Sequence, residues 1–142
     1  LRSFTCSRRI DALKVWVAIQ RYGAAGLGAL YDHLCATTRA LHDAVQQRPD
    51  FIAEHEPESN ILCFRYVGDG SRTDDQLDAL NLELRTAYNR GGDGWITSTV
   101  LGGRRVLRAT LMNPRTTEDD VARVLDGLAT LGTDPIRKQA RP

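Results

Sequence analysis

Two places in this 142-residue chain combine residue types that bind anions. The first is the segment Cys6-Ser7-Arg8-Arg9, which stands where the first helix is predicted to begin. A hydroxyl, two guanidinium groups and the free backbone N–H groups of a helix start together suit an anion such as a phosphate. The same pattern is also typical of a simple N-cap followed by two solvated arginines, and this second interpretation is the one that the pattern alone favours.

The second place is Arg108, which lies inside a predicted strand. Alternation along residues 106–112 puts Leu107, Ala109 and Leu111 on one face. Arg108 therefore shares the opposite face with apolar and hydroxyl side chains. Burying a guanidinium without a partner costs free energy. Arg108 must therefore contact water, pair with a carboxylate of the protein, or bind an anionic ligand. The pattern alone favours the first two.

Other chemistries have little support in the sequence. The histidines His33, His42 and His55 are scattered, and no nucleophile, zinc-protease or phosphate-loop motif is present. Three cysteines without a C-x-x-C pair argue against a metal site or a disulfide framework and favour a reducing cytoplasm. A net charge of +1 argues against nucleic acid as the default partner, and no apolar stretch approaches the ~20 residues that a membrane span needs.

The elements that must position these residues follow from hydrophobic periodicity. Helices are predicted from about Ser7 to Gly23, over residues 27–48, from a capping box at Thr73, and over residues 116–132. Strands are predicted over residues 51–56, 61–67, 95–101 and 104–112, the last two joined by a Gly102-Gly103 hairpin turn. This order predicts an α+β fold with helices packed on one face of a small antiparallel sheet.

Four blocks of the sequence resemble one family. Residues 6–16, 22–27, 60–66 and 106–114 resemble, in this order, segments from the C-terminal region of the group II pyridoxal-phosphate-dependent amino-acid decarboxylases. That family includes the glutamate, aromatic-L-amino-acid and diaminobutyrate decarboxylases. The resemblance extends from residue 4 to about residue 132.

The resemblance implies the C-terminal domain of a fold-type-I, aspartate-aminotransferase-like enzyme that acts as a homodimer. Residues 1–48 would lead from a large cofactor-binding domain, residues 49–132 would form the small α+β domain, and residues 133–142 would be a flexible tail. The chain does not begin with Met, and we expect it to be part of a longer protein. The missing large domain would then cover Trp16 or its neighbours, which should be exposed in this chain.

The resemblance also implies roles for the two anion-binding candidates. The residue at Ser7 would lie near the phosphate of pyridoxal 5'-phosphate across the dimer interface. Arg108 would bind the carboxylate of the amino-acid substrate and orient the bond that breaks when CO₂ leaves. The family's Schiff-base lysine follows a histidine, and no His-Lys pair occurs in this sequence. We therefore expect this chain alone to be inactive. The sequence does not identify which amino acid the full-length enzyme would decarboxylate.

A different class of function also fits the same residues. The chain would then be a non-catalytic α+β module for dimerisation or ligand binding that keeps the fold without the chemistry.

Overall fold

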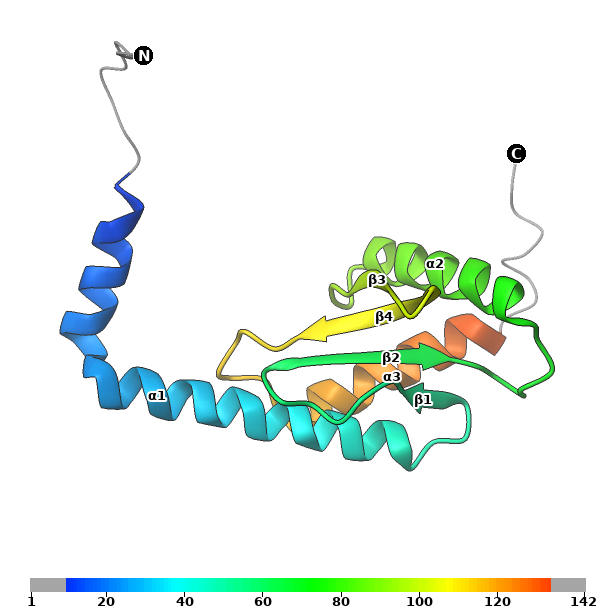
Figure 1. The fold of residues 1–142 in the computed structure, drawn as a ribbon, viewed down its shortest axis with the longest axis horizontal. Coiled ribbons are helices and arrows are strands. Elements are labelled where there is room, and N and C mark those ends of the chain that lie inside the picture. Colours follow the sequence, from blue (N-terminus) through cyan, green and yellow to red (C-terminus); the bar gives the residue numbers. More distant parts are fainter. Residues whose placement is uncertain (1–9, 134–142) are drawn as a thin grey trace, which may run out of the picture. The chain divides into compact units, whose positions relative to one another are not determined.

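The computed structural model describes residues 10–133, which form three helices and a four-stranded sheet (Figure 1). The elements are α1 (Asp11–Gln46), β1 (Phe51–Ala53), β2 (Ile61–Tyr66), α2 (Asp74–Gly91), β3 (Thr97–Leu101), β4 (Arg104–Thr110) and α3 (Glu118–Thr133). Contacts divide the chain into two compact units between Asp32 and His33. The last part of α1 therefore belongs to the second unit, whereas the predicted domain boundary at residues 48 and 49 stays a prediction.

The described part of the first unit is helical and exposes its apolar side chains. Gly23 interrupts α1 with a positive φ of 65° and a ψ of 173°, which confirms the predicted break between two helices. Trp16 is 58% exposed and Ile10 is 69% exposed. This confirms the expectation of exposed apolar residues near Trp16. Within residues 10–133, no helix combines the length and apolar character needed to cross a bilayer.

The sheet has the strand order β1-β2-β4-β3, and every neighbouring pair is antiparallel. The predicted hairpin joins β3 to β4 through Gly102 and Gly103, which both have positive φ values. Because successive side chains of a strand point to opposite faces, Leu62, Phe64 and Tyr66 of β2 share one face. Leu107 of β4 lies opposite Phe64 and joins the same buried cluster.

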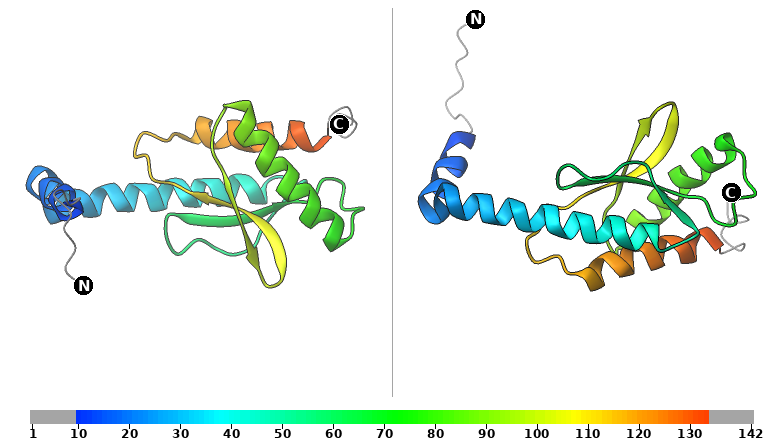
Figure 2. Two further views of the ribbon diagram at one scale, coloured as in Figure 1. Left: turned by 90° about the horizontal axis from the view of Figure 1, so that it is seen from above. Right: turned by 60° about the horizontal axis from the view of Figure 1, so that its bottom comes forward.

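All three helices contribute to the core on that face of the sheet. The second half of α1 supplies Leu41 and Val45, which are buried. The predicted apolar stripes of α2 and α3 supply the rest of the helical core, and the two helices contact each other beside the sheet (Figure 2). The prediction of an α+β fold with helices on one face of a small antiparallel sheet is confirmed.

A buried amide joins α2 to the sheet where two strands separate. The β2–β4 ladder runs from Ile61 to Phe64, so the backbone of Tyr66 has no partner on β4. The side chain of Asn81 supplies the missing hydrogen-bond partners. Its oxygen accepts from the Tyr66 N–H at 3.0 Å, and its nitrogen donates to the Tyr66 carbonyl at 2.9 Å. Asn81 is completely buried, and its hydrogen bonds offset the cost of burying the amide.

Gly132 has a different function from the one predicted. The sequence predicts that it ends the last helix, but α3 continues to Thr133 and Gly132 lies buried inside it. A Cβ atom at this position would lie 2.7 Å from the Tyr66 hydroxyl oxygen and closer still to ring carbons. Tyr66 is itself buried and packs edge-on against Phe51, with the ring centroids 5.1 Å apart. Gly132 is therefore required by the close approach of α3 to this ring.

We expect Gly132→Ala to lower the free energy of unfolding by about 1–3 kcal/mol, because the added methyl group overpacks a ring that cannot move aside. Urea denaturation of the chain followed by circular dichroism measures this. Gly28→Ala is the matched control, since a Cβ atom there meets nothing within 4 Å and alanine favours a helix. An equally stable Gly132→Ala variant would contradict the close approach.

A candidate anion-binding site on the open face of the sheet

Arg108 lies on the face of the sheet opposite the core cluster, which we call the open face. Its neighbour Leu107 is fully buried in the core, whereas Arg108 itself is exposed. Within residues 10–133, its guanidinium group makes no hydrogen bond or ion pair. The sequence left three possibilities for Arg108: contact with water, an ion pair within the protein, or an anionic ligand. An ion pair with an acid of the described residues is not observed. The side chain is free to bind an anion.

The register of the strands places Arg108 in a line of four residues, which we call the outer row: Glu54, Cys63, Arg108 and Thr97. Cys63 of β2 and Thr97 of β3 are the direct partners of Arg108. Glu54 follows β1, and its N–H donates to the Cys63 carbonyl at 3.0 Å. Directly opposed residues of an antiparallel pair project their side chains to the same face. The outer row therefore runs across the whole sheet.

The thiol of Cys63 occupies the middle of this row as a neutral group. Burial raises the pKa of Cys63, the Arg108 guanidinium opposes that change, and the Glu54 carboxylate adds to it. Because burial has the largest effect, the thiol stays protonated at neutral pH. Arg108 and Glu54 are both close enough to shift the pKa of this thiol. The neutral thiol cancels the charge of neither residue.

His55 holds the end of β1 against β2. The Cys63 N–H donates to Nε2 of His55 at 3.1 Å, so this nitrogen must be the unprotonated one. Nδ1 lies 3.0 Å from the Glu56 carbonyl oxygen and therefore carries the proton that it donates there. The neutral ring thus extends the β1–β2 ladder beyond its last backbone pair. It also fixes the backbone from which Glu54 projects.

Arg108 differs from the other arginines of the open face in having no acidic partner among the described residues. Arg65 is buried and binds two carboxylates of α2, Asp74 and Asp78. Arg104 binds Glu54, with 2.7 Å between Nη2 and Oε2. The positive charge of Arg108 is therefore the part of this face that a carboxylate or phosphate from outside would neutralise. A hydrogen bond to such a charged group is worth about 1.5–3 kcal/mol.

The remaining predicted candidates do not add to this site. Ser7 lies outside the described residues, so its predicted position near a phosphate stays a prediction. Lys14 is the lysine that the structure describes, and its ammonium group binds Asp11 at 2.9 Å. Between Ile10 and Thr133, no three His, Cys, Asp or Glu side chains are grouped closely enough to hold a metal ion.

Glu54 is a residue of this face that the sequence patterns did not predict, and His55 stood among scattered histidines. A usable signal was present, because Phe51 and Ala53 alternate with Ile52 and Glu54. Burial of Phe51 puts Glu54 on the same face as Ile52, opposite the core. What the sequence could not show is that Cys63 and Arg108 stand in the same line, since strand order is a property of the fold.

The sequence of this chain matches the model of one protein family. The pyridoxal-dependent decarboxylase conserved domain matches residues 2–67. The L-2,4-diaminobutyrate decarboxylase of Rhizobium meliloti (strain 1021) is 35% identical over 99% of this chain and 28% of its own length.

Solved structures extend the likeness to the fold. The glutamate decarboxylase domain of a diaminobutyrate-pyruvate transaminase and L-2,4-diaminobutyrate decarboxylase from Vibrio parahaemolyticus has a TM-score of 0.76 and 30% identity, over 88% of this chain and 26% of that one. Oryza sativa TDC, solved with PLP and tryptamine, has a TM-score of 0.77 and 26% identity, over 92% of this chain and 28% of that one.

The fold and the sequence therefore define a small α+β domain of the kind found in pyridoxal-phosphate-dependent decarboxylases. The chain belongs to the group II pyridoxal-dependent decarboxylase family, as its sequence motifs predicted. It spans about a quarter of the length of the relatives it matches.

We expect His55→Ala to lower the free energy of unfolding by about 1–3 kcal/mol, because the Cys63 N–H loses its acceptor at a buried position. Urea denaturation of the chain tests this. Glu56→Ala is the control, since it removes an exposed side chain from the same loop and keeps the carbonyl that His55 uses. If the two variants were equally stable, His55 would not hold the strand end.

Proposed function

We propose that this chain is the C-terminal part of a pyridoxal-phosphate-dependent L-amino-acid decarboxylase, which removes the α-carboxylate of its substrate as CO₂. The observation that carries the proposal is the unpaired guanidinium of Arg108 on the open face of the sheet. The family match supports it, because relatives along nearly the whole chain are named as amino-acid decarboxylases.

In this proposal Arg108 binds and orients the substrate carboxylate. A planar guanidinium can hold both carboxylate oxygens at once, which fixes the direction of the bond to the α-carbon. Binding the carboxylate tightly also stabilises the substrate before reaction, so strength alone does not accelerate the reaction. The useful contribution is orientation, because a correctly aimed bond reacts much faster than a freely rotating one. Arg108 can do this only from a fixed strand position.

The cofactor of the proposed enzyme would be held by other parts of the protein. Lys14, the lysine among residues 10–133, is paired with Asp11. When bound, this cofactor supplies the electron sink for decarboxylation. We propose that Ser7 lies near its phosphate across a homodimer interface.

The first unit supports the proposal of a missing large domain. Its described residues expose several large apolar side chains, namely Ile10, Leu13, Val15, Trp16, Val17, Ile19, Tyr22 and Tyr31. So many exposed large apolar side chains within one segment are typical of an interaction site in a soluble protein. We propose that the large domain covers it in a homodimer that works in the cytoplasm on an amino acid, without nucleic acid or membrane as a partner.

We expect Arg108→Ala in the full-length enzyme to lower kcat/KM by about 10- to 100-fold, which corresponds to losing one charged hydrogen-bonded contact. Cofactor binding, followed by the absorbance of bound pyridoxal phosphate, should change little. Arg105→Gln is the matched control, because Arg105 is on the same strand but on the opposite face. Unchanged kinetics of Arg108→Ala would exclude the proposed carboxylate contact.

We also expect the 142-residue chain by itself to release no CO₂ from amino acids in the presence of pyridoxal phosphate, because it has no His-Lys pair. Release of labelled CO₂ from carboxyl-labelled amino acids measures this, with the full-length protein as the positive control. Turnover by the isolated chain would show that it carries its own catalytic lysine, and Lys14→Ala would identify it.

A further inference from the structure

A hollow of about 510 Å³ lies beside the first half of α2. Two residues of the preceding loop and four residues of the helix line it, namely Ser71, Arg72, Gln76, Ala79, Leu80 and Glu83. Part of this lining is apolar, because Leu80 belongs to the core and Ala79 beside it is exposed. Arg72 and Glu83 add charges of opposite sign. The volume lies in the range of pockets that receive a ligand or a side chain from elsewhere.

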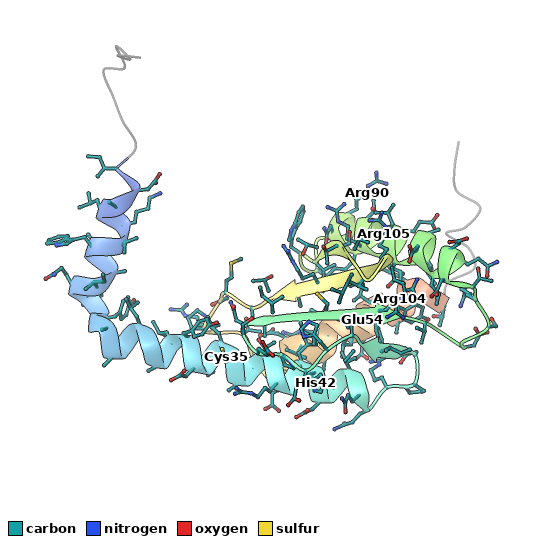
Figure 3. All side chains as sticks on the ribbon, viewed as in Figure 1. Cys35, His42, Glu54, Arg90, Arg104 and Arg105 are labelled. Carbon is teal, nitrogen blue, oxygen red and sulfur yellow. The ribbon has the colours of Figure 1, made fainter. Side chains whose placement is uncertain are left out.

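The two charged residues of the hollow make little use of their charges within the described structure. Glu83 makes no hydrogen bond or ion pair with any of residues 10–133. Arg72 lies 3.5 Å from the carboxylate of Asp69, whose side chain is 72% exposed, and an ion pair as exposed as this one contributes little. Glu54, by contrast, is bound to Arg104, which lies beside it in Figure 3. The hollow therefore offers a cation and an acid to another segment.

The end of α3 lies next to Arg72. A Cβ atom on Gly132 would lie 2.7 Å from the Tyr66 hydroxyl oxygen. A Cβ atom on Gly68 would lie 3.6 Å from the same oxygen and 2.8 Å from Nη1 of Arg72. The last turn of α3 and the Arg72 guanidinium are therefore neighbours on either side of one hydroxyl group. Figure 1 shows the end of α3 and the start of α2 at the same end of the sheet, so the chain leaves Thr133 close to the hollow.

The sequence that follows α3 complements the hollow in order and in length. In residues 134–137 an acid is followed by a proline, an isoleucine and a cation. Along the direction away from α3, the hollow presents a cation (Arg72), an apolar side chain (Leu80) and an acid (Glu83). The acid and the cation of the segment lie about 10 Å apart when the chain is extended. The helix rises by about the same distance along residues 76–83, which line the hollow.

We propose that residues 134–137 fold back onto α2 and fill this hollow. Three contacts hold the segment there: Asp134 with Arg72, Ile136 with Leu80, and Arg137 with Glu83. The occupant is a segment of the same chain, and its docking ties the end of α3 to the start of α2. This inference does not depend on the decarboxylase function, so each of the two proposals can fail without the other.

Cleavage by trypsin tests the inference, because trypsin cuts after Arg137 and Lys138 and the cleavage rate follows the population of the undocked segment. The measured quantity is the cleavage rate in the full 142-residue chain divided by that in a free peptide of residues 130–142. We expect the parent chain to be cut about 10-fold more slowly than the peptide. Glu83→Gln should raise the ratio about 2- to 5-fold, which is the effect of losing one exposed ion pair. Glu58→Gln is the matched control, an exposed acid in the loop between β1 and β2 that should keep the parent ratio.

Three results would overturn the inference. These are a parent chain cut as fast as the peptide, a Glu83→Gln variant with the parent ratio, and protection that grows with protein concentration, which would assign the hollow to a second copy of the chain. Ile136→Ala keeps the test decisive if Glu83→Gln disturbs the fold, because it changes no described residue. Measured against its own peptide, it should raise the ratio about 5- to 10-fold through the lost apolar contact.

Discussion

The pairing of β2 with β4 is the interaction on which the rest of the structure depends. It sets Phe64 against Leu107 on the core face and Cys63 against Arg108 on the open face. A slip of one residue would exchange the two faces, because side chains alternate along each strand. The slip would bury a guanidinium among leucines and expose the apolar core, so hydrophobic burial also holds Arg108 where an anion can reach it.

The helices pack mainly on the core face of the sheet, and α2 also reaches Arg65 on the other face. Asn81 completes the backbone pairing of Tyr66 where β4 has turned away, and Gly132 lets α3 lie directly on the Tyr66 ring. On the open face, Arg65 draws α2 toward β2 through two carboxylates. The charge of Arg65 is therefore neutralised by ion pairs that stabilise the fold. Arg108 makes no such ion pair within the described residues.

The sequence predicted the elements well because each has a local physical cause. The capping box of Thr73 and Gln76, the break at Gly23 and the Gly102-Gly103 turn are all observed. The two faces of β4 follow from alternation alone. Gly132 was misjudged because its role is set by a ring 66 residues earlier in the chain. The outer row was also out of reach, since no local pattern places β2 between β1 and β4.

The open face divides its charges in a way that a closed structural network would not. Structural ion pairs in this unit bring cation and acid together, as Arg48 does with Asp50 and Asp126. In the outer row, by contrast, Glu54 is paired with Arg104, whereas Arg108 has no acidic partner among residues 10–133. The Arg108 side chain is exposed, so water solvates its charge and the fold gains no ion pair from it. A carboxylate that displaces this water would meet a guanidinium whose position the β2–β4 pairing has already fixed.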